Sequence, residues 1–222
     1  MARDMFHSEL EVLQEKVLKM GNLVENAIAC SVKALKEQNL ELAERVIAQD
    51  DWVDDLQLQI EDKCLTMLAL QQPMARDLRM IGTALKIVTD LERMADHAVD
   101  IARATLAIGN EPLIKPLIDI PRMAQLTQEM VHIGLTAYIE QNVELCHSLI
   151  EKEKEVDFLY DTVFNDLLEF MTQDAKTSRQ ATYLLLVALF LERVADHVTN
   201  VGEWTIYLVT GERIDLNDDH LL

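Results

Sequence analysis

The chain has 222 residues, of which 39 are acidic and 20 basic, giving a formal net charge of −19. Nucleic-acid affinity depends on Lys and Arg side chains that displace counterions, so this charge makes DNA and RNA poor partners. The charge also opposes direct adhesion to anionic lipid, and no run approaches the roughly 20 apolar residues that span a membrane. Half of the residues are apolar and only 6 are Gly and 4 Pro, a composition that favours long helices over disorder or a turn-rich β fold.

Three helices are expected in each half of the chain. They cover residues 4–38, 39–70 and 74–108 in the first half, and residues 120–140, 142–172 and 178–210 in the second. Asn39 and Asn142 stand where a side-chain oxygen caps a new helix, and Gly109 and Gly211 stand where helices stop. The segment 110–121 contains three prolines and is the one convincing linker.

An internal repeat organises the chain. Residues 37–42 (Glu-Gln-Asn-Leu-Glu-Leu) return as residues 140–145 at an offset of 103, and residues 91–97 return as residues 191–197 at an offset of 100. A duplication explains both offsets if the turns between these blocks absorb the difference. We therefore expect an all-α fold of two tandem antiparallel three-helix bundles, in units of residues 1–110 and 111–222.

The beginning of the chain and its cysteines indicate the compartment. The N-terminal residues lack the continuous apolar core of a secretory signal. Cys30, Cys64 and Cys146 are scattered and odd in number, which argues against a disulfide framework or a zinc site. A cytoplasmic protein with reduced, buried cysteines is expected.

Eight carboxylates form four pairs with the same spacing. Each pair consists of an acidic residue and an Asp four positions later, so that both lie on one helix face. The pairs are Asp50 with Asp54, Glu92 with Asp96, Glu153 with Asp157, and Glu192 with Asp196.

Within each half of the chain, the two carboxylate pairs are also expected to lie at the same level along the helical hairpin. In an antiparallel hairpin, residues equally far from the turn lie level with one another. Asp54 and Glu92 are equally far from position 73, as are Asp50 and Asp96, and the second copy has the same symmetry about a point between residues 174 and 175. The sequence therefore predicts two clusters of four carboxylates, on the accessible outside of each bundle.

Such clusters favour metal binding. Four neighbouring carboxylates repel one another, and hard cations held by oxygen ligands neutralise that charge. The alternative is a solvated acidic face with weak ion pairs, in which Arg93 and Arg193 neutralise part of the charge. An all-carboxylate ligand set leaves the metal open, magnesium and manganese included. His97 and His197 are expected to support the ligands or to pack.

Other chemistry is poorly supported. A ferritin-like centre needs a repeated Glu-x-x-His, but only Glu144 and His147 have this spacing. No phosphate-binding glycine loop or nucleophile elbow occurs. Arg79 and Arg179 recur at the offset of 100. Their recurrence leaves phosphate or partner binding open, but we expect each to form a hairpin ion pair.

The chain resembles the PhoU family. The resemblance rests on residues 75–79 (Ala-Arg-Asp-Leu-Arg), followed by residues 90–98, and on residues 191–200, so that Glu-Arg-x-x-Asp-His occurs twice. It spans nearly the whole chain and implies two three-helix bundles. In some family members duplicated acidic motifs bind multinuclear iron or zinc clusters, which implies metal ligands at Asp50, Asp54, Glu92, Asp96, Glu153, Asp157, Glu192 and Asp196. Asp100 departs from the Asn often found in the motif, so the first cluster could differ in charge or occupancy.

The resemblance also implies a regulatory function. PhoU-like proteins restrain phosphate uptake and the phosphate-starvation response, through the ATPase subunit of a phosphate ABC transporter and a sensor histidine kinase. We thus expect a non-enzymatic regulator, a homodimer that reaches the membrane only through protein partners. Two other hypotheses stay open: a helical chaperone adaptor and a carboxylate-bridged metal enzyme.

Overall fold

The computed structural model describes residues 2–217, with side chains from Phe6 onward. Residue 1 and residues 218–222, at the outer ends of the two expected units, lie outside this range. Every regular element in it is helical, which confirms the predicted all-α class. In chain order the elements are α1 (Ala2–Glu37), α2 (Leu40–Gln71), α3 (Arg76–Ile108), α4 (Asp119–Glu140), α5 (Val143–His147), α6 (Leu149–Gln173), the 3₁₀ turn η1 (Ala175–Thr177) and α7 (Ser178–Thr210).

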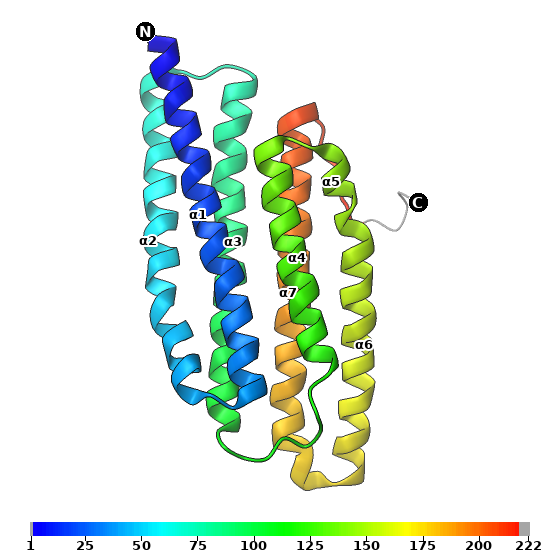
Figure 1. Cartoon of the computed structure of the whole chain (residues 1–222). Helices are drawn as coiled ribbons and strands as arrows, with labels where there is room; N and C mark the ends of the chain where they lie inside the picture. The colour runs from blue at the N-terminus through cyan, green and yellow to red at the C-terminus, as the bar shows by residue number, and fades with distance from the viewer. Residues whose placement is uncertain (1, 218–222) are drawn as a thin grey trace.

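The helices form two antiparallel bundles that lie side by side (Figure 1). Helices α1, α2 and α3 make the first bundle, and α4, α6 and α7 make the second, with the short α5 beside them. Helices α3 and α7 make the most extensive contact between any two elements, so they form the centre of the molecule. The α2–α3 and α6–α7 turns lie at opposite ends of the molecule.

One hydrophobic core runs through both bundles. Leu13, Ile87, Met130 and Val187 are all fully buried and belong to the same cluster. The core is continuous because α1 contacts α4 and α3 contacts α7 across the bundle boundary. Cys64 and Cys146 are buried as predicted, Cys30 is half-buried, and all three are free thiols.

The repeated Gln-Asn dipeptide forms the same turn in both bundles. Gln38 and Gln141 end α1 and α4 in the left-handed region, with φ of 50° and 54°. Asn39 N–H donates to the Ala34 carbonyl, and Asn142 N–H donates to the Ala137 carbonyl, which closes the end of each helix. Both Asn side chains then cap the following helix, as predicted.

The glycine stops and the linker are also where the sequence places them. Gly109 and Gly211 follow α3 and α7 with φ of 67° and 82°, values that favour glycine. The connection between α3 and α4 is held against both bundles. Gln38 donates to the carbonyls of Gly109 and Glu111, while Gln180 accepts from Ile114 N–H.

The predicted helix over residues 142–172 is wrong as a single element. The chain instead forms α5 and α6, which are separated at Ser148. The Ser148 hydroxyl donates to the Leu145 carbonyl at 2.7 Å, and Ser148 N–H donates to Glu144. A serine that bonds back to its own turn competes with regular helix geometry, which explains the break.

Candidate functional site

The first cluster of carboxylates comes together between α2 and α3. Asp50 and Asp54 extend from α2, and Glu92 and Asp96 extend from α3. Burial, followed by repulsion from Asp54 and Asp96, raises the pKa of Asp50 to about 6. Burial also raises the pKa of Asp54 and of Glu92, and in both cases Asp96 contributes the largest repulsion. All four predicted residues therefore share one electrostatic environment.

Arginine neutralises part of this charge. Arg93 lies 3.5 Å from a Glu92 oxygen and 3.2 Å from an Asp96 oxygen. Asp100 pairs with Arg103 at 2.9 Å instead of joining the cluster. The Glu92 side chain is 20% exposed and that of Asp96 is 44% exposed. The cluster is thus half-buried, and the negative charge of its four carboxylates exceeds the single positive charge of Arg93.

The second cluster repeats the arrangement between α6 and α7. Burial, then repulsion from Asp157 and a hydrogen bond with it, raises the pKa of Glu153 to about 7. Burial also raises the pKa of Asp157, Glu192 and Asp196. Arg193 lies 3.6 Å from a Glu192 oxygen. The second repeat therefore has the same arrangement of helices as the first and also brings its four carboxylates close enough to influence one another.

The donor set of both clusters suits a hard cation. Every ligand candidate supplies carboxylate oxygen, and Glu192 Oε2 is buried without a hydrogen-bond partner. Its ion-pair partner Arg193 lies 3.6 Å away, too far for a hydrogen bond, and a bound cation would approach that oxygen more closely. Among the side chains of residues 6–217, however, no three His, Cys, Asp or Glu groups converge closely enough to hold a metal ion. The clusters provide donors and excess charge, but their side chains as positioned do not close a coordination shell.

The two repeated histidines lie between the bundles and not among the carboxylates. The rings of His97 and His197 are 5.8 Å apart, and His97 stacks on Phe190 at 5.6 Å. Burial, then His197, lowers the pKa of His97. His197 Nδ1 lies 2.9 Å from an Asp90 oxygen. Both histidines therefore pack at the contact between α3 and α7.

Asp90 is the residue of this region that the sequence patterns did not identify. It is only 9% exposed and also accepts a hydrogen bond from the Asn200 side chain at 3.2 Å. A comparison of the two repeats could have identified Asp90, because the second copy has Phe190 at the equivalent position.

Arg79 and Arg179 do not form the expected ion pairs within their hairpins, so that prediction is wrong. Arg79 Nε donates to the Leu208 carbonyl at 3.2 Å, in the last turn of α7. Arg179 donates to the Ala107 carbonyl, in the last turn of α3, and pairs with Glu111 in the linker at 2.9 Å. Each arginine thus satisfies free carbonyls at the end of the other bundle's helix.

The fold and the paired clusters define the class of protein: a duplicated three-helix bundle with one acidic site in each copy. The model of the PhoU domain matches residues 17–105 and 120–205, one match in each bundle. The chain belongs to the PhoU family.

Relatives and solved structures match almost the full length. A phosphate-specific transport system accessory protein PhoU homolog from Clostridium acetobutylicum is 42% identical over 98% of this chain and 100% of its own length. A homolog of the same description from Aquifex aeolicus is 44% identical over 92% of each chain. The crystal structure of PhoU from Pseudomonas aeruginosa has a TM-score of 0.89 at 32% identity, covering 93% of this chain and 100% of that chain. The phosphate transport system regulatory protein PhoU from Streptococcus pneumoniae has a TM-score of 0.88 at 30% identity, covering 95% and 99%.

Proposed function

We propose that this chain is an accessory protein of a phosphate-specific transport system and restrains phosphate uptake when phosphate is plentiful. The observation that carries the proposal is the match along nearly the whole chain to proteins described as transport-system accessory proteins. Among residues 2–217, none of the helices is long and apolar enough to cross a membrane. The proposed form of the chain is a cytoplasmic homodimer that acts through protein partners. The partners are the ATPase subunit of a phosphate ABC transporter, a sensor histidine kinase, or both.

The proposed action needs no catalysis. Regulation of this kind requires only that the chain bind a partner in one state of phosphate supply and release it in another. The function is accordingly that of a binding protein that controls both uptake and the starvation response.

Both clusters are proposed metal sites. Asp50, Asp54, Glu92 and Asp96 would hold one site, and Glu153, Asp157, Glu192 and Asp196 the other. The support is the all-oxygen donor set, the raised pKa values and the buried oxygen of Glu192 that makes no hydrogen bond. Bound iron, zinc, magnesium or manganese would neutralise the charge that the carboxylates concentrate.

Gene deletion tests the regulatory proposal. In phosphate-rich medium, deletion should raise the initial rate of radiolabelled phosphate uptake and the expression of a starvation-gene reporter, and the wild-type gene should reverse both. Unchanged uptake and reporter expression would contradict the proposal. Copurification of the tagged chain with a chaperone, and not with transporter or kinase, would favour the adaptor hypothesis.

Metal analysis of purified protein tests the proposal that the carboxylate clusters bind metal. An Asp54→Ala, Glu92→Ala variant should contain less metal than the wild type by mass spectrometry. The control is an Asp51→Ala, Asp55→Ala variant, because these exposed residues lie on α2 beside the cluster. Equal metal content in all three proteins would remove Asp54 and Glu92 as ligands.

A further inference from the structure

Three leucines on the α2–α3 hairpin are strongly exposed. Leu58 is 60% exposed, Leu65 is 58% exposed and Leu78 is 48% exposed. Large exposed apolar groups that lie together mark interaction sites more often than single ones do. We call these three leucines the apolar patch.

Helical spacing places the apolar patch on the same outer face as the first carboxylate cluster. Leu58 follows Asp54 by four residues and Leu65 follows Leu58 by seven, so all three share one side of α2. Leu78 precedes Glu92 by two heptads and shares its side of α3. Leu65 and Leu78 lie within about two helical turns of the hairpin turn at residues 72–75. The hairpin face is therefore acidic in its middle and apolar towards the turn.

The surface beside Leu78 is open. A methyl group added at Gly82, one turn after Leu78, would meet nothing within 4 Å. The half-buried Leu85 follows on the same side of α3. A side chain from a partner thus has room to pack against bare helix backbone.

The second bundle presents a similar face. Leu168 corresponds to Leu65 at the repeat offset of 103 and is 48% exposed, and Phe164 on the same side of α6 is 40% exposed. Leu58 is replaced by Asp161, so the second face is more polar at that position. A leucine is exposed at the equivalent position of both repeats, which favours a common binding role over chance exposure.

The acidic residues around these leucines favour a positively charged partner. Asp51 and Asp55 are exposed beside Leu58, and Glu61 lies between Leu58 and Leu65 on the same side of α2. A second copy of a chain with net charge −19 would bring like charges together, and an anionic lipid surface would do the same. A cationic partner is attracted, and its apolar side chains would cover the leucines.

We propose that the outer face of the α2–α3 hairpin docks an amphipathic helix of a protein partner. Its apolar residues would cover Leu58, Leu65 and Leu78, and its Lys or Arg residues would lie beside Asp51, Asp55 and Glu61, which are not among the proposed metal ligands. A helix laid into such a face uses anchors at spacings of three, four and seven residues. This inference rests on the proposed function, since a regulator without catalysis acts through protein partners. It adds the surface and the chemistry of the partner segment.

A labelled peptide provides the test. The probe is a fluorescein-labelled 20-residue synthetic helix with leucines at these spacings in one half and Lys and Arg in the other. Fluorescence anisotropy should show saturable binding to the wild-type protein, weakened at least about tenfold by Leu65→Ser with Leu78→Ser. Asp51→Asn with Asp55→Asn should weaken binding less, and added salt should weaken it further.

The matched control is Leu18→Ser. Leu18 is 38% exposed and belongs to α1, outside the α2–α3 hairpin, and its variant should bind the peptide as the wild type does. Circular dichroism verifies that each variant is folded. Equal binding by wild type and patch variant, or no saturable binding by the wild type, would overturn the proposal.

Two further measurements separate other occupants. A wild-type dimer that the patch variant converts to a monomer, by analytical ultracentrifugation, would assign the surface to a second copy and overturn the proposal. Patch-dependent cosedimentation with vesicles of anionic phospholipid would assign it to a membrane, with the same consequence. Peptide binding is measured on purified protein, so its failure is distinct from unchanged phosphate uptake after gene deletion.

Discussion

His197 Nδ1 lies 2.9 Å from Asp90 Oδ1, and this contact joins α7 of the second bundle to α3 of the first. Asn200 donates to the same oxygen. At the equivalent position of the other repeat, His97 stacks on Phe190. The centre of the duplicated fold is thus asymmetric: one histidine has an acidic partner and the other has an aromatic one.

Removal of the Asp90 carboxylate should destabilise the chain. Asp90→Ala leaves the half-buried polar groups of His197 and Asn200 without their acceptor, which should lower the free energy of unfolding by about 1–3 kcal/mol. Urea denaturation followed by circular dichroism measures the change. Asp55→Ala, at an exposed position on α2, should stay within about 0.5 kcal/mol of wild type. A similar small effect of Asp90→Ala would show that the contact does not stabilise the fold.

The arginines that reach across the bundles should also contribute to stability. Arg179→Ala frees the Ala107 carbonyl and Glu111, and should cost about 1 kcal/mol. Arg79→Ala frees the Leu208 carbonyl and should cost a similar amount. Thermal unfolding of each variant and of the double variant measures these losses. The costs should add, because the two contacts lie at opposite ends of α3 and share no partner.

Metal-free protein should become less stable as pH rises from about 4.5 to about 7. Glu153 has an ordinary pKa of 4.5 and a folded pKa of about 7, and Asp50 has an ordinary pKa of 3.8 and a folded pKa of about 6. The folded chain therefore binds these protons more tightly than the unfolded chain does. The stabilisation is complete below the ordinary values and is lost as pH rises through the folded values.

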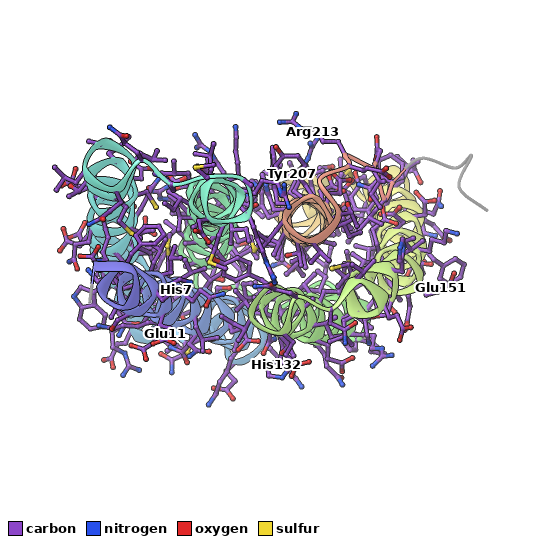
Figure 2. All side chains as sticks on the ribbon, turned by 90° about the horizontal axis from the view of Figure 1, so that it is seen from above. His7, Glu11, His132, Glu151, Tyr207 and Arg213 are labelled. Atoms are coloured by element: carbon purple, nitrogen blue, oxygen red, sulfur yellow. The ribbon has the colours of Figure 1, made fainter. Side chains whose placement is uncertain are left out.

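Urea midpoints measured in a chelator at pH 5 and pH 8 test this prediction. Glu153→Gln should raise the midpoint at pH 8 and reduce the difference between the two pH values. Glu151→Gln is the control, because Glu151 lies at the outer edge of the same bundle, away from its centre (Figure 2). A midpoint that rises with pH in the wild type would contradict the prediction.

Two glycines within helices should respond oppositely to the same substitution. Gly82→Ala should raise the free energy of unfolding by about 1 kcal/mol, because a methyl group there meets nothing within 4 Å and alanine favours helix. Gly21→Ala places its methyl 2.2 Å from Leu135 Cδ1, a buried side chain at the α1–α4 contact. It should lower stability by about 1 kcal/mol or more. Chemical denaturation checks both, and a gain at Gly21 would show that Leu135 moves aside freely.

Local patterns predicted most of the elements. Asn39, Asn142, Gly109 and Gly211 mark helix ends in the sequence, and all four mark them in the structure. These signals work because caps and stops depend on the hydrogen bonds and backbone angles of a few adjacent residues. Ser148 broke one predicted helix by the same local chemistry, since its hydroxyl competes for a carbonyl of the preceding turn.

Contacts between the bundles were not predictable in the same way. The recurrence of Arg79 and Arg179 indicated a shared role, but the expected partner was in the wrong bundle. Asp90 carried no local signal beyond its mismatch with Phe190. In the view from above, His132 of α4 lies on one side of the molecule, with Tyr207 and Arg213 on the opposite side (Figure 2). Periodicity gives the apolar face of each helix, but does not say which bundle that face meets.

The sequence by itself determined the helices, the duplication and the two sets of four carboxylates, because spacing along a helix and distance from a turn follow from the covalent chain. Only the tertiary structure decided that one core joins both bundles and that each arginine caps the opposite helix. It also decided that the histidines meet between α3 and α7 and not beside the carboxylates. These features depend on how α3 and α7 pack over a long separation in the chain, and packing selects among arrangements that the same local pattern permits.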